Sequence, residues 1–140
     1  MPEQISLYRS PRSSGHIGGR KLIVEDERLI GLALKDCLQR AGCHVTWVET
    51  DGAAYDALGA GGPPFDTLIL DVDLGPGTTG FDIARFARAR FPDIGVVYSS
   101  GNPAEWLDNF GVAGAIYLSK PFTEWSLIAA LERLAPAPPR

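Results

Sequence analysis

Five short apolar runs, each followed by a helix signal, constrain the fold of this sequence more than any other feature. The runs predict strands at residues 21–24, 44–49, 65–72, 94–99 and 115–119. They read as continuously apolar, in stretches such as LIV, TLIL and GVVY, which is typical of strands covered on both faces. Alternating βα units of this length favour a parallel sheet with helices on both sides. We therefore predict an α/β fold, a three-layer (βα)5 domain with a doubly wound parallel sheet.

The two ends of the chain differ in composition from the part between them. Residues 1–19 are rich in Ser, Gly, Pro and Arg and lack periodicity, which predicts a flexible N-terminal arm. Residues 136–140 contain three prolines and predict a disordered tail. Residues 20–135 remain for the folded domain, a length that suits a single hydrophobic core.

Composition excludes several classes of function. Seventeen acidic residues against thirteen Lys and Arg give a formal charge of -4, which argues against a nucleic-acid partner. No apolar run approaches the roughly 20 residues of a membrane span, and the first residues lack a signal-peptide core. We expect a cytoplasmic protein without a membrane partner. Cys37 falls on the apolar stripe of the first helix, which predicts a buried thiol rather than a zinc ligand.

Acids, hydroxyls and one lysine follow four of the five predicted strands. In open parallel sheets, functional sites form beyond the carboxyl ends of the strands, so these residues should lie at one edge of the sheet. They are Glu25 and Asp26 after the first strand, Asp71 and Asp73 after the third, Ser99 and Ser100 after the fourth, and Lys120 after the fifth.

This set of side chains predicts phosphoryl chemistry. Crowded carboxylates repel one another, and a hard divalent cation such as Mg²⁺, which prefers oxygen ligands, relieves the repulsion. A carboxylate at such a site can act as the nucleophile toward phosphorus and form an aspartyl phosphate. Lys120 is a compact cation suited to the charge on the transferred group.

The residues that carry this chemistry resemble those of the receiver domain of two-component response regulators. KLIVEDE is similar to its first strand and acidic pair, LILDVDL to its phosphoacceptor strand, VVYSSGN to its hydroxyl-bearing strand and YLSKPF to its lysine-proline signature. The resemblance covers about residues 20–135 and implies the flavodoxin-like strand order 2-1-3-4-5.

The resemblance also implies a role for each residue of the site. Asp71 would be the phosphoacceptor, and Lys120 would contact a phosphoryl oxygen. Ser100 would be the switch hydroxyl, with Ser99 as the alternative, and Tyr117 would be the switch aromatic. The Mg²⁺ ligands would be Asp26, Asp71, Glu25 through water, and the backbone carbonyl of Asp73. The Lys120–Pro121 bond would be cis.

Two departures from the family pattern affect the expected surface. The loop from Asp71 to Gly80 is about one residue longer than usual, with Gly75-Pro76-Gly77 shaping it. The stretch from Ser100 to Lys120 is about two residues short, so the fourth helix, signalled by Asn102-Pro103, should be brief. In the family this region commonly forms the output or dimer face.

The function implied is that of a stand-alone, phosphorylation-dependent signalling switch. A histidine kinase or phosphotransfer protein would donate the phosphoryl group, and a downstream protein target would read the altered surface. The protein would be a monomer or weak homodimer. It would not be an enzyme acting on external substrates, although a receiver can catalyse its own phosphorylation and dephosphorylation. Asp73 and Asn102 lie where side chains influence attack of water on the acyl phosphate.

Two alternatives remain from the sequence. DVDLGPGTT resembles the first motif of haloacid dehalogenase-like phosphatases, in which Asp71 would be the nucleophile and Asp73 the acid/base. That motif normally begins the chain, and Glu25 and Asp26 would be left without a role. The second alternative is a phosphate-independent protein-binding module that keeps the fold.

Overall fold

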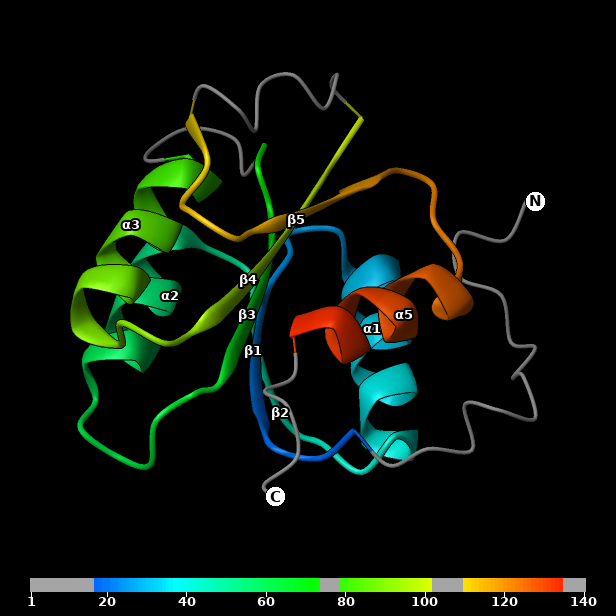
Figure 1. Cartoon of the computed structure of the whole chain (residues 1–140), viewed down its shortest axis with the longest axis horizontal. Helices are drawn as coiled ribbons and strands as arrows, with labels where there is room; N and C mark the ends of the chain where they lie inside the picture. The colour runs from blue at the N-terminus through cyan, green and yellow to red at the C-terminus, as the bar shows by residue number, and fades with distance from the viewer. Residues whose placement is uncertain (1–16, 74–78, 102–109, 135–140) are drawn as a thin grey trace.

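A five-stranded parallel sheet forms the centre of the computed structural model, which describes residues 17–73, 79–101 and 110–134. The strand order is β2-β1-β3-β4-β5, as the receiver resemblance implies. The strands are β1 (Arg20–Val24), β2 (His44–Val48), β3 (Thr67–Asp71), β4 (Gly95–Ser100) and β5 (Ile116–Ser119). All four pairings are parallel, which confirms the predicted sheet (Figure 1).

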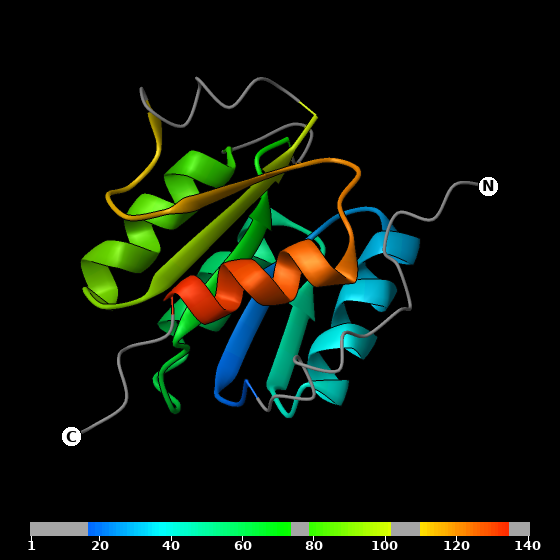
Figure 2. The same cartoon turned by 45° about the vertical axis from the view of Figure 1, so that its right-hand side comes forward.

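Helices cover both faces of the sheet. In Figures 1 and 2, α2 (Asp51–Gly59) and α3 (Gly80–Arg90) lie on one side, whereas α1 (Arg28–Arg40) and α5 (Glu124–Leu134) lie on the other. The three-layer arrangement is therefore as predicted. The arm, the tail, the loop of Gly75-Pro76-Gly77 and the helix expected after Asn102 fall wholly or mainly outside the described residues.

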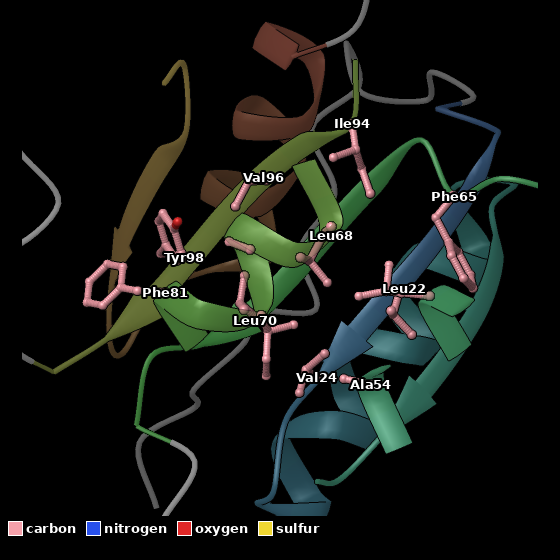
Figure 3. Packing of buried hydrophobic residues seen from close by; sticks show 14 of the residues in the cluster. Leu22, Val24, Ala54, Phe65, Leu68, Leu70, Phe81, Ile94, Val96 and Tyr98 are labelled. Atoms are coloured by element: carbon pink, nitrogen blue, oxygen red, sulfur yellow. The ribbon is translucent and has the colours of Figure 1, made fainter. Parts of the chain in front are cut away.

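Two apolar clusters hold the layers together, one on each face. The cluster under α2 and α3 is shown in Figure 3 and includes Leu22, Leu68, Leu70, Val96 and Tyr98, all fully buried. The opposite cluster joins α1 and α5 to the sheet. Cys37 and Cys43 are both buried free thiols in it, as predicted for Cys37. At roughly 25 cal/mol per Å² of buried apolar surface, these clusters supply the main stabilisation of the domain.

The start of α3 is fixed tightly against the end of β3. Thr79 caps the helix, because its hydroxyl accepts from the Asp82 backbone N–H while the Asp82 carboxylate accepts from the Thr79 N–H. A Cβ on Gly80 would lie 2.6 Å from the Asp71 carbonyl oxygen and 2.9 Å from the Val72 Cα. Only glycine permits this close approach, which keeps the start of α3 directly against the end of β3.

Among the described residues, no helix combines the length and the apolar character needed to cross a bilayer.

Candidate functional site

The carboxyl ends of β1 and β3 bring three acids into one cluster. Carboxylate oxygens of Glu25, Asp26 and Asp71 all lie within 4.8 Å of one another. Asp71 is the last residue of β3, while Glu25 and Asp26 directly follow β1, and the two strands are neighbours. The sheet therefore places the three acids together as the sequence predicted.

Lys120 completes the cluster from the end of β5. Its Nζ lies 3.1 Å from Asp71 Oδ2 and 3.4 Å from Glu25 Oε1, so one ammonium is shared between two buried carboxylates. The backbone N–H of Lys120 donates to the Ser100 carbonyl at 2.9 Å, which fixes its position relative to β4. The Lys120–Pro121 peptide bond is cis, as the resemblance implied.

Glu25 is the most deeply buried acid of the cluster, with an exposed fraction of 1%. Burial raises the pKa of Glu25 to about 7, although Lys120 and the Glu27 backbone N–H oppose the shift. The Asp71 charge adds to the rise. Glu25 therefore changes between its protonated and ionised forms near neutral pH when no metal ion is bound.

Asp71 and Lys120 are also perturbed by their surroundings. Burial raises the pKa of Asp71, and the Asp73 N–H, which donates to Asp71 Oδ1 at 2.9 Å, partly offsets this rise. Burial alone would lower the pKa of Lys120, but the charges of Glu25 and Asp71 outweigh it and raise that pKa. Lys120 thus stays cationic. The Asp73 N–H and Lys120 favour the ionised form of Asp71, which is the form that a nucleophile needs, against the effect of burial.

Ser100 and Tyr117 lie on the neighbouring strands. Ser100 is buried, and its hydroxyl lies 3.4 Å from Asp73 Oδ2. The Tyr117 hydroxyl is 3.4 Å from the Ser100 carbonyl oxygen, and the Tyr117 side chain is half-buried at the end of the sheet. Ser99 is equally buried and pairs in register with Asp71. The two serines therefore both lie at the predicted strand end.

Two residues that were not predicted from the strand ends also contact the cluster. A Glu27 carboxylate oxygen lies 3.9 Å from Lys120 Nζ, at the start of α1. The indole N–H of Trp47 donates to the backbone carbonyl of Glu25 at 2.9 Å. The only sequence signal for the second contact is Gly31, an unfavourable residue within a helix whose missing side chain makes room for the indole.

The donor set fits Mg²⁺. It consists of hard carboxylate oxygens, and the three acids are close enough for one ion to contact more than one of them. Two of the acids are buried, so the repulsion between their charges is poorly screened and favours a cation. Asp26 is exposed, which leaves an open side for water and an incoming phosphate.

The five-stranded doubly wound sheet, with three acids and a lysine at its carboxyl edge, is a flavodoxin-like α/β fold with an acidic site. Comparison with known proteins identifies the family. The family model described as "Response regulator receiver domain" matches residues 22–132. This chain belongs to the response regulator receiver family of two-component signalling.

Individual relatives agree with this assignment. The response regulator receiver protein CpdR of Brucella abortus is 32% identical over 117 residues, covering 82% of this chain and 95% of CpdR. A crystal structure of a response regulator receiver protein from Sinorhizobium medicae has a TM-score of 0.79 at 32% identity, covering 84% of this chain and 94% of that one.

Other relatives are longer than the matched region. The transcriptional regulatory protein QseB of Escherichia coli O157:H7 is 33% identical over 117 residues, and the match covers 82% of this chain but 52% of QseB. The chain therefore spans nearly the whole of CpdR and about half the length of QseB.

Proposed function

We propose that this receiver is a phosphorylation-dependent switch whose phosphoacceptor is Asp71. The observation that carries the proposal is the meeting of Glu25, Asp26 and Asp71 beside the Lys120 ammonium. Asp71 is held at the end of a fully buried strand, so its carboxylate has little freedom to move away from an incoming phosphoryl group.

The reaction transfers a phosphoryl group from a phosphohistidine of the donor protein. A carboxylate oxygen of Asp71 forms a bond to phosphorus while the bond between phosphorus and the donor nitrogen breaks, and the nitrogen keeps the electron pair. Bound Mg²⁺ would supply charge neutralisation for the acids and the phosphoryl oxygens. Asp26 and Asp71 would hold it through their carboxylates, Glu25 through water and Asp73 through its carbonyl.

Lys120 has a second task after transfer. In the unmodified protein it is paired with Asp71 Oδ2 and Glu25. Phosphorylation adds charge of about -1.5 to -2 and three acceptor oxygens at Asp71, so the ammonium gains a stronger partner in a phosphoryl oxygen. Ser100 would donate its hydroxyl to another of these oxygens.

Movement of Ser100 gives the signal a route to the surface. Tyr117 contacts the Ser100 carbonyl and lies on the adjacent strand. A shift of β4 at Ser100 changes the space next to the half-buried ring, which biases an existing equilibrium between two positions of Tyr117. A downstream protein would distinguish the two surfaces.

The biological setting follows from the same proposal. The donor is a histidine kinase or phosphotransfer protein, and the receiver works in the cytoplasm without nucleic acid or membrane as its partner. It acts as a monomer or weak homodimer. It is not an enzyme toward external substrates, and any catalysis is limited to its own phosphorylation and dephosphorylation.

Intact-mass measurement tests the proposal. Incubation with Mg²⁺ and a small phosphodonor should add one phosphoryl group to the wild-type chain and none to Asp71→Asn. Lack of any gain in the wild type would leave the phosphate-independent binding module as the better account. Turnover of a generic phosphate ester, abolished by Asp73→Asn, would instead favour the dehalogenase-like phosphatase.

Asp73 should set the lifetime of the phosphorylated state. Its carboxylate lies 3.4 Å from the Ser100 hydroxyl and its backbone N–H donates to Asp71 Oδ1, so Asp73 is adjacent to the proposed phosphoacceptor. We expect Asp73→Asn to change the dephosphorylation rate by about tenfold while phosphorylation persists. Decay of the phosphoryl mass after removal of the donor measures this rate, and an unchanged decay would remove Asp73 from the mechanism. Asn102, predicted to share this role, lies outside the described residues.

A further inference from the structure

The Trp47 side chain on β2 is hydrogen-bonded to the backbone of the turn that contains Glu25 and Asp26. Among the hydrogen bonds described for residues 17–73, no other β2 side chain bonds this turn. β2 is the edge strand beside β1, and Trp47 pairs in register with Ile23. Its indole N–H donates to the Glu25 carbonyl at 2.9 Å, while the Val48 carbonyl accepts the Glu25 N–H at 3.0 Å. Both backbone groups of Glu25 are thus held by β2.

The carbonyl bond controls more than Glu25 itself. A peptide unit is planar, so fixing the Glu25 oxygen also fixes the plane that holds the nitrogen and Cα of Asp26. The Glu25 carboxylate is held separately, by the Glu27 N–H at 3.1 Å and by Lys120. The indole bond therefore fixes the peptide that joins the two neighbouring acids of the cluster.

Gly31 of α1 leaves the space that the Trp47 indole occupies. A Cβ on Gly31 would lie 2.2 to 2.5 Å from three atoms of the Trp47 ring, including Nε1, so any larger residue would displace the ring. Glycine inside a helix costs about 1 kcal/mol relative to alanine. We attribute the glycine at this position to the space that the Trp47 indole needs. α1 lies alongside β2 (Figure 2), and the Gly31 N–H bonds the Glu27 carbonyl in its first turn.

We propose that Trp47, which packs against Gly31, is a positioning residue for the magnesium site. It orients the peptide between Glu25 and Asp26, so that both acids face the cation that Asp71 shares. This inference rests on the proposed function, since it concerns the same Mg²⁺ site. Residues that orient ligands without touching the metal commonly change metal affinity by about 10- to 100-fold when replaced.

Calorimetric Mg²⁺ titration of four proteins tests the inference: wild type, Trp47→Phe, Gly31→Ala and Val45→Ala. Trp47→Phe keeps an aromatic ring and removes the N–H, and should weaken Mg²⁺ binding about tenfold. Gly31→Ala should act in the same direction by displacing the indole, even though alanine favours the helix. Val45→Ala is the matched control, because it truncates a half-buried side chain on the same face of the same strand without touching Glu25.

Amide hydrogen exchange supplies a readout without metal. In Mg²⁺-free protein, Trp47→Phe should speed exchange at Asp26 and Glu27 more than at the centre of β1, whereas Val45→Ala should not single out this turn. Wild-type protein that binds no Mg²⁺ would overturn the proposed site itself. The role of Trp47 alone would be overturned if Trp47→Phe bound Mg²⁺ as tightly as the wild type does. It would also be overturned if Val45→Ala weakened Mg²⁺ binding as much as Trp47→Phe does.

Discussion

Glu25→Gln should make the Mg²⁺-free protein more stable than the wild type above neutral pH. Burial raises the folded-state pKa of Glu25 from its ordinary 4.5 to about 7, so the folded state binds this proton more tightly than the unfolded state. Stability from this group is complete below pH 4.5 and is lost as the pH rises through about 7. The loss is on the order of 3 kcal/mol, from about 1.4 kcal/mol per pKa unit.

Denaturant unfolding in a chelator, at several values between about pH 5 and pH 8, measures this effect. Wild-type stability should fall across the range, and Glu25→Gln should fall much less, although Asp71, whose pKa is also raised, still contributes. Mg²⁺ should restore the wild type at high pH because it binds the ionised acid. Glu49→Gln, at an exposed position just after β2, is the control. Parallel curves for the wild type and Glu25→Gln would contradict the buried environment of Glu25.

Arg40→Met should destabilise the protein by about 2 to 3 kcal/mol, because it leaves a buried carboxylate without its cation. Glu124, the first residue of α5, is only 3% exposed, and its two carboxylate oxygens accept from Arg40 at 3.2 and 3.4 Å. Cys37 lies against the same carboxylate, and burial together with the Glu124 charge raises the pKa of this thiol to about 12. Methionine keeps the aliphatic stem of Arg40 but provides no cation.

Two further variants separate this cause from general damage. Asp36→Asn removes the exposed partner of Arg40 on α1 and should cost less than about 0.5 kcal/mol. Arg40→Met combined with Glu124→Gln should recover much of the loss, because no buried charge remains. Denaturant unfolding midpoints measure all three, and a double variant weaker than Arg40→Met would contradict the explanation. Glu124 lies four residues after Lys120, so this ion pair also anchors the helix that follows the site lysine.

Much of the site could be predicted because it depends on strand ends. Apolar runs locate β1, β3 and β5, and parallel pairing then brings Glu25, Asp26, Asp71 and Lys120 to one edge without any knowledge of side-chain packing. The capping box at Thr79 is equally local, because it joins residues only three positions apart. The choice between Ser99 and Ser100 was not settled in this way, because both end the same strand and both are buried.

The remaining contacts depend on tertiary packing. Arg40 and Glu124 are 84 residues apart, and nothing in either helix pattern shows that a glutamate at the start of α5 is buried. The indole bond from Trp47 to Glu25 joins a side chain to a backbone carbonyl 22 residues away, just after a different strand. Periodicity reports which face of an element is apolar, but it does not report which polar atoms meet across two elements.

Locating the phosphoryl group on the chain tests the central claim most directly. Protein treated with a small phosphodonor can be reduced with borohydride, which converts an acyl phosphate to an alcohol, and then digested for peptide mass spectrometry. With Mg²⁺ present, the reduced residue should be Asp71 alone, and prior removal of Mg²⁺ with a chelator should abolish the product. Modification at another residue, or equal modification without the metal, would contradict a shared site at the ends of β1, β3 and β5.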